Sequence, residues 1–405
     1  MGGLRPVRAL LVAVFMLMAG SGFLATLIAL RLRDAGEGAG MIGLVATCYF
    51  AGLALGSLLV FRLVRRVGHI RAYAAFVSLY SATILTYAMV QHPGLWAGLR
   101  LIDGFCMAGV FVCLESWLNE RAPPEGRGRI LAMYMIALYV GQAAGQPILT
   151  LFGTQATLPF IAGSALLSLA VLPVALTRMP APSLPEGGTM GIRHLYAASP
   201  LGVVGAFSNG IVLGAFYGLG GLFAAGIGLD LAGTSLFMSA AILGGVILQW
   251  PLGMLSDRYD RRRVMAGTLA AALVLSLAII LATLEAGPVM LTVTVLFGGT
   301  AFAIYPLCVA HTNDRLNSDQ RVGASGGLVL TYSAGAVAGP LLGSGGMAVA
   351  GPTGLFWILA LISGLCLAFA WRRMRITEPV PEAQQMPYQI LPRTTPVAAT
   401  LDPHA

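Results

Sequence analysis

The chain has 405 residues, of which 57% are hydrophobic and only 10% are charged, whereas soluble domains carry roughly 25% charged residues. This composition excludes a soluble globular protein and indicates a protein that lives in lipid. All 24 basic residues are arginine, so a Gly-x-x-x-x-Gly-Lys-Ser/Thr phosphate loop is absent and ATP-driven transport by this chain alone is excluded. A basic membrane protein accounts for the formal charge of +8, and we expect no nucleic-acid partner.

Apolar stretches of about 20 residues, long enough to cross a hydrocarbon core of roughly 30 Å as a helix, recur between short charged loops. We therefore predict an all-α membrane protein with twelve transmembrane helices. In chain order the predicted ranges are 8–31, 41–63, 70–91, 94–117, 128–151, 157–177, 199–226, 231–256, 263–285, 287–311, 321–346 and 352–373.

Proline and glycine divide these helices into two groups. Residues 178–198 have linker composition, so we predict an N-terminal six-helix bundle over 1–177 and a C-terminal six-helix bundle over 199–375. The linker is expected to be cytoplasmic. Residues 376–405 are rich in proline and are expected to form a disordered cytoplasmic tail.

The arginines are distributed unequally between the two sides of the predicted membrane. All but Arg31, Arg33 and Arg100 fall in segments on the same side as the N-terminus. Cytoplasmic loops carry an excess of basic residues. We therefore expect a multi-pass protein of the bacterial cytoplasmic (inner) membrane, in contact with membrane lipid and with both termini cytoplasmic.

An Asn-acid-Arg triplet and two glycines recur in the second half at one common displacement. The matching pairs are Asn119 and Asn313, Glu120 and Asp314, Arg121 and Arg315, Gly141 and Gly335, and Gly145 and Gly339. Such duplication indicates two copies of one membrane unit, the way several secondary transporters are built, with the substrate path between the halves.

Corresponding loops follow the second and eighth predicted helices. Residues 253–262 read Gly-Met-Leu-Ser-Asp-Arg-Tyr-Asp-Arg-Arg. This loop resembles the motif Gly-x-x-x-Asp-Arg-x-Gly-Arg-Arg of the major facilitator superfamily (MFS). In the first copy Arg65 stands at the Asp position, and in the second Asp260 replaces the second Gly. The segments around both triplets resemble a branch of bacterial inner-membrane facilitators whose members are largely uncharacterised.

The resemblance implies a twelve-helix MFS fold with a gate at the cytoplasmic side. We expect the Asp257 loop to dock near Arg127 and Arg129 as the stronger latch; a plain positive-inside anchor is the alternative. For the triplets, gate support and ordinary helix capping remain alternatives. The expected gate residues are Arg65, Arg66, Gly68, Gly253, Asp257, Arg258, Arg261, Arg262, Asn119, Glu120, Asn313 and Asp314.

The fourth predicted helix contains Arg100, Asp103 and Glu115. Ionised groups at that depth are costly unless they are paired or wetted, and Arg100 and Asp103, three residues apart, can neutralise each other. Arg100 and Gly104 resemble the family's Arg-x-x-x-Gly motif, which is linked to proton coupling. All three ionisable residues are candidates for proton coupling, and Asp103 is the candidate carrier; a structural ion pair is the alternative.

Small residues four apart and a nearby proline mark the fifth and eleventh predicted helices, which suits close helix packing. These runs resemble the family's Gly-rich motif of antiporters, and general packing is the alternative. The packing candidates are Gly141, Gly145, Pro147, Gly335, Gly339 and Pro340.

The family's cavity-lining helices would be the first, fourth, seventh and tenth of this chain. From them we take Met107, Asn209, Tyr217 and Tyr305 as candidates for the substrate cavity; packing is the alternative role of each. This lining suits a neutral or amphipathic organic molecule.

No cysteine or histidine spacing indicates a metal site, and no cofactor or enzyme activity is expected. We predict a monomeric secondary transporter that exports a small organic solute by alternating access, coupled to protons. The alternatives are uptake, uncoupled facilitation, or a non-transporting membrane sensor or scaffold.

Overall fold

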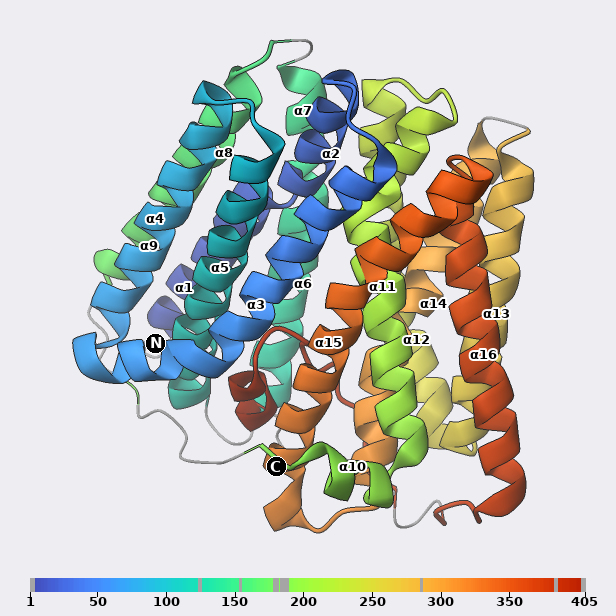
Figure 1. The fold of residues 1–405 in the computed structure, drawn as a ribbon. Coiled ribbons are helices and arrows are strands. Elements are labelled where there is room, and N and C mark those ends of the chain that lie inside the picture. The colour runs from blue at the N-terminus through green and yellow to red at the C-terminus, as the bar shows by residue number, and fades with distance from the viewer. Residues whose placement is uncertain are drawn as a thin grey trace.

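The computed structural model describes residues 4–122, 126–152, 155–177, 182, 189–284, 287–381 and 385–401. These residues form helices and no β-strand, which confirms the all-α prediction. The helices stand side by side as one bundle (Figure 1).

The first half holds six predicted spans, three of which are interrupted. Its helices are α1 (Leu4–Ser21), α2 (Leu24–Asp34), α3 (Ala39–Val67), α4 (His69–Met89), α5 (Pro93–Arg121), α6 (Arg127–Gly145), α7 (Ile148–Leu151), α8 (Leu158–Leu169) and α9 (Val171–Ala175). The second half contains α10 (Ile192–Ala198), α11 (Pro200–Gly226), α12 (Leu231–Arg258), α13 (Arg261–Ala282), α14 (Pro288–Asn313), α15 (Ser318–Ala350), α16 (Gly354–Ile376) and the 3₁₀ helix η3 (Pro396–Leu401).

Within the described part of the chain, eleven helical segments are long and apolar enough to cross a membrane. The predicted fifth span is not among them, because α6 begins with Arg127 and Arg129, carries Gln142 and ends at Gly145. Together α6 and α7 still run through the bundle beside the other helices (Figure 1).

Two of the interruptions face each other. Helix α1 ends before Gly22, and α6 ends before Gln146 and Pro147, whose ring nitrogen cannot donate a hydrogen bond. The Gln146 side-chain amide donates to the Gly22 carbonyl oxygen at 2.8 Å. A side chain thus satisfies a backbone group freed by the helix break, as the lipid environment demands.

The small-residue positions of the repeat make equivalent close crossings. A Cβ added at Gly145 would lie 2.4 Å from the Ala19 carbonyl oxygen, and one added at Gly339 would lie 2.5 Å from that of Ile211. Helix α6 therefore packs tightly on α1, and α15 packs equally tightly on α11, the first helix of the second half.

The two halves touch through α2 and α11, α3 and α15, and α6 and α12. The Ser239 hydroxyl donates to the Ala143 carbonyl oxygen at 3.0 Å, and a Cβ added at Gly43 would meet the Ser344 side chain. These contacts lie toward the end of the bundle where α2 and α7 lie. We call the opposite end, where α10 and the turn between α12 and α13 lie, the arginine-rich end (Figure 1).

The sequence predicted a disordered C-terminal tail, but the tail follows a defined path in the structure. Residues 385–401 run back between the halves, and η3 contacts α5, α6 and α15. Leu391, Val397 and Ala398 are buried. The tail has too few apolar residues to form a core of its own, but a cavity that the helices have already built offers it burial.

The predicted linker at 178–198 is described only in part, since residues 178–181 and 183–188 lie outside the described ranges. Its last residues form α10, and the Met190 backbone N–H donates to the Gly323 carbonyl oxygen at 2.8 Å. This end of the linker is therefore fixed to the start of α15.

The crossing of α11 and α15 can be tested with two glycines of the same helix. A Cβ added at Gly335 would lie 2.1 Å from the Phe207 backbone oxygen, whereas one added at Gly345 would meet nothing within 4 Å. Gly335→Ala should lower the free energy of unfolding by about 1–3 kcal/mol through overpacking. Gly345→Ala should leave it unchanged or raise it by up to about 1 kcal/mol. Unfolding in mixed detergent measures both, and equal values would contradict the close crossing.

Candidate functional site

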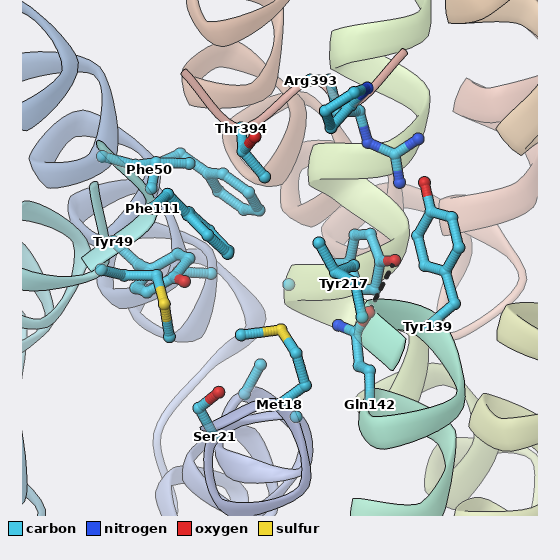
Figure 2. A pocket seen from close by; sticks show the side chains of 18 of the residues that line it. Met18, Ser21, Tyr49, Phe50, Phe111, Tyr139, Gln142, Tyr217, Arg393 and Thr394 are labelled. Carbon is cyan, nitrogen blue, oxygen red and sulfur yellow. Dashed lines mark hydrogen bonds between the residues drawn. The ribbon is translucent and has the colours of Figure 1, made fainter. Parts of the chain in front are cut away.

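A cavity of about 140 Å³ lies between the two halves. Met18, Ser21, Tyr49, Phe50 and Phe111 line it from the first half (Figure 2). Ligand pockets usually measure roughly 300–1,000 Å³. This cavity is smaller because three residues of the tail, Pro392, Arg393 and Thr394, form part of its wall.

Two of the four predicted cavity residues line the cavity, and two do not. Met107 and Tyr217 line the cavity, as does Arg100. Asn209 instead donates from its side-chain amide to the Ala301 carbonyl oxygen at 2.7 Å and so joins α11 to α14. The Tyr305 ring packs edge-on against Tyr332 with ring centroids 5.3 Å apart; neither Asn209 nor Tyr305 is among the lining residues.

Arg100 and Asp103 form a buried polar cluster beside the cavity. Arg100 Nη1 lies 3.6 Å from Asp103 Oδ2, and its guanidinium carbon lies 4.2 Å from the centre of the Tyr49 ring. The Tyr87 hydroxyl donates to Asp103 Oδ2 at 2.6 Å. The long carboxylate distance and the ring stacking show that Arg100 divides its interactions between Asp103 and Tyr49.

Thr83 of α4 supplies a further contact to Asp103. Its Oγ1 lies 2.5 Å from Asp103 Oδ1 and 2.7 Å from the Tyr80 carbonyl oxygen. A hydroxyl has one hydrogen, and a backbone carbonyl can only accept. Both contacts are hydrogen bonds at once when Asp103 carries a proton, because its carboxyl group then donates to Thr83 while Thr83 donates to Tyr80.

Glu115 lies further along α5, fully buried. The Tyr134 hydroxyl donates to Glu115 Oε1 at 2.8 Å, and the hydroxyls of Thr394 and Thr395 donate to its two oxygens. Among the ion pairs of the described residues none includes Glu115. Its polar partners are therefore one tyrosine of α6 and the tail.

Arg393 reaches from the tail into a group of aromatic rings. Its guanidinium carbon lies 4.7 Å from the centre of the Phe302 ring, 5.5 Å from that of Tyr332 and 5.8 Å from that of Tyr139. We call these three rings, with Tyr217 beside them, the aromatic cage. Figure 2 shows the Arg393 side chain directed toward Tyr139 and Tyr217.

Sequence reasoning missed three members of the cage and the tail itself. Tyr139 and Tyr332 lie on the fifth and eleventh predicted spans. The predicted cavity residues, in contrast, come from the first helix of each three-helix group. One signal was present: both tyrosines lie inside apolar segments, away from the membrane interfaces where tyrosine is enriched.

Three residues of the predicted gate in the second half contact one another. Arg261 Nη1 donates to both carboxylate oxygens of Asp314 at 2.7 Å, and its Nη2 donates to Asp257 Oδ1 at 2.9 Å. The side chains of Arg261 and Asp314 are each only 2% exposed, whereas that of Asp257 is 37% exposed. The main partner of Arg261 is therefore Asp314 of the repeated triplet.

Asp260, which replaces the motif's second Gly, caps α13. Burial raises the pKa of this carboxyl, but hydrogen bonds from Arg262 outweigh burial and lower the pKa overall. The Arg262 Nη2 to Asp260 Oδ2 distance is 2.8 Å. Asp260 therefore stays ionised and anchors Arg262.

The tail, rather than the start of α6, contacts the carboxylates of Asp257 and Asp314 in this structure. Asp257 accepts the Tyr388 backbone N–H at 2.9 Å, and Asp314 accepts that of Met386 at 2.9 Å. The Tyr388 ring packs on Gly253, where an added Cβ would lie 2.1 Å away. In this structure the partners of Asp257 are Arg261 and the tail, and the predicted docking on Arg127 and Arg129 stays a prediction.

The corresponding positions of the first half are more open to solvent. Arg65 and Arg66 are exposed, and Gly68 has φ +84° at the turn between α3 and α4. Glu120 is exposed and Asn119 half-buried, whereas Asn313 and the side chain of Asp314 are buried. Arg258 is also exposed. The repeat thus places equivalent residues in unequal surroundings.

Among the described residues, no group of three or more His, Cys, Asp or Glu side chains is placed to hold a metal ion.

Two packed halves around a central cavity define a membrane transporter of the secondary type. Comparisons with known proteins agree. The family model described as Major Facilitator Superfamily matches residues 10–284 and 202–398. The chain therefore belongs to the major facilitator superfamily of membrane transporters.

Two bacterial transporters of the same family are similar to the chain over most of its length. The chain is 29% identical to the uncharacterised MFS-type transporter YcaD of Escherichia fergusonii over 92% of this chain and 97% of that one. It is 30% identical to an uncharacterised MFS-type transporter of Enterobacter sp. (strain 638), over 83% and 87%.

Solved structures are similar in fold. The nucleoside transporter NupG gives a TM-score of 0.74 at 17% identity, covering 93% of this chain and 100% of that one. A bacterial homologue of the human lysosomal transporter Spinster, solved inward-facing and unoccupied, gives 0.73 at 14% identity, covering 92% and 97%.

The two partners of Arg261 provide a matched test of the gate. Asp314→Ala removes a buried, doubly hydrogen-bonded carboxylate and should cost about 3 kcal/mol of stability, because it leaves the Arg261 charge poorly compensated. Asp257→Ala removes a partly exposed one and should cost less than about 1 kcal/mol. Each carboxylate also accepts a backbone N–H of the tail, so the two variants differ in the burial of the carboxylate and in the number of hydrogen bonds that it accepts from Arg261. Equal losses in detergent unfolding would contradict this assignment.

Proposed function

We propose that this protein exports a small organic solute in exchange for protons across the bacterial cytoplasmic membrane, by alternating access of a site between its halves. Asp103 is the proposed proton carrier, and Arg100 is its partner at the cavity wall. The supporting observation is the contact set of Asp103, a fully buried carboxyl group that contacts Thr83 and Tyr87 and lies 3.6 Å from Arg100 of the cavity wall.

The position of Asp103 suits coupling between the proton and the solute. A carboxyl group buried in a membrane helix is a functional candidate by default, because an unpaired charge there is expensive. Proton loss would strengthen the attraction between Asp103 and Arg100, and proton uptake would leave the Arg100 charge at the cavity wall without its counter-charge. A positively charged solute would then be repelled while Asp103 holds a proton, so solute and proton binding oppose each other, which is the condition for exchange.

The arginine-rich end is the proposed cytoplasmic side, following the rule that basic residues stay inside. Contacts between the halves lie toward the opposite end, and the tail enters from the arginine-rich end. This arrangement fits an inward-facing state, the state in which the Spinster homologue of similar fold was solved. The predicted latch between Asp257 and the start of α6 would form in the opposite state.

The coupling proposal can be tested with purified protein in vesicles. A melting-temperature screen of organic compounds first identifies a ligand, since a ligand of the folded state raises its stability. Asp103→Asn should reduce transport of that compound driven by a pH gradient by at least about tenfold, because removing an essential proton carrier removes the driving force. Its exchange without a gradient should persist.

Asp230→Asn is the matched control, because Asp230 only caps α12, where Asn caps equally well. Full gradient-driven transport by Asp103→Asn would exclude Asp103 as carrier. The same result together with loss of coupling in Glu115→Gln would assign the proton to Glu115. Proton movement in the same direction as the solute would favour uptake over export.

A further inference from the structure

The aromatic cage holds a ligand that belongs to the chain itself. Phe302 and Tyr332 come from α14 and α15 of the second half, and Tyr139 comes from α6 of the first. A cation within about 6 Å of a ring centre is attracted to the ring face, and Arg393 meets that condition with all three rings. The cage is therefore a built cation site shared by both halves.

No carboxylate competes with the rings for Arg393. None of the ion pairs within the described ranges involves Arg393. The Arg393 side chain is directed toward Tyr139 and Tyr217, and the Tyr217 hydroxyl donates to Gln142 Oε1 at 3.2 Å (Figure 2). Rings and hydroxyls recognise a flat, weakly hydrated cation rather than a compact ammonium.

We propose that the aromatic cage is the subsite for the cationic group of the transported solute, and that Arg393 fills it as an internal competitor. The solute class is a small amphipathic organic compound with one planar guanidinium or amidinium group. This inference rests on the proposed function, because it names the substrate of the same cavity.

The other residues of the cavity wall indicate the chemistry of the solute beyond its cationic group. Met18, Phe50, Met107 and Phe111 offer apolar surface for an aromatic or aliphatic body. None of the described residues that line the cavity is Asp or Glu. A second positive charge on the solute would meet no free carboxylate there, so one cationic group is the limit.

The tail is bound on both sides of Arg393. Met386 and Tyr388 bind the turn at Asp314 and Asp257 through backbone N–H groups. Beyond them, Thr394 and Thr395 bind Glu115. A tethered group acts at an effective concentration in the mM range, so Arg393 should weaken binding of a free cation by about tenfold or more.

Benzamidinium and its neutral isostere benzamide are suitable probes, because they differ in one charged group. Titration calorimetry on the full chain in detergent would compare wild type, Arg393→Gln and the control Arg375→Gln. Arg375 stacks on Trp371 at the end of α16, outside the cavity. Arg393→Gln should bind benzamidinium about tenfold or more tightly than wild type, while benzamide affinity stays within about twofold. Arg375→Gln should match wild type.

A second variant tests whether the aromatic rings contribute to binding of the cation. Phe302→Leu added to Arg393→Gln should weaken benzamidinium binding about threefold, the usual worth of one cation–ring contact, with benzamide unchanged. If Arg393→Gln does not elute as a folded monodisperse protein, Arg393→Ala replaces it in both comparisons.

Equal benzamidinium affinity in wild type and Arg393→Gln would overturn the inference, as would an equal gain for benzamide. These results are independent of proton coupling. If the protein exchanges solute for protons but shows no charge-selective gain, the inference about the aromatic cage is wrong and the proposed function stands. If it shows the gain but no proton exchange, the cage is a cation site and the proposed function is wrong.

Discussion

The cost of leaving a polar group without a partner in lipid governs this protein. Three buried ionisable side chains find partners on other elements: Asp103 binds Tyr87 of α4, Glu115 binds Tyr134 of α6, and Arg261 binds Asp314, directly after α14. These partnerships determine which helices must lie together. Functional and structural constraints coincide, because the same groups that need partners can also exchange them for a proton or a solute.

Close helix crossings build the frame in which these partnerships form. Apolar side chains gain little by leaving lipid for another helix, so association depends on contact area and backbone approach. The repeated glycines provide that approach on equivalent helix pairs, α1 with α6 and α11 with α15. The frame is thus duplicated, while the polar groups placed on it are not, and this difference allows the halves to have unequal roles.

The tail binds residues of the predicted gate. The carboxylates of the second half hold backbone N–H groups of the tail, and Gly253 receives the Tyr388 ring. The tail also completes the hydrogen bonding of Glu115 and places a cation among aromatic rings. One short segment therefore connects the gate, a buried acid and the cavity.

The sequence by itself determined the helical membrane fold, the two halves and the pair of Arg100 with Asp103, because hydropathy, repeat spacing and an offset of three residues are properties of local sequence. It could not place Thr83 beside Asp103, nor bring Tyr139 and Tyr332 around Arg393. Those neighbours come from separate helices and depend on how the bundle closes. The ordered tail was equally beyond local sequence, because a proline-rich, polar segment acquires a defined path only where an assembled cavity partners its backbone and side chains.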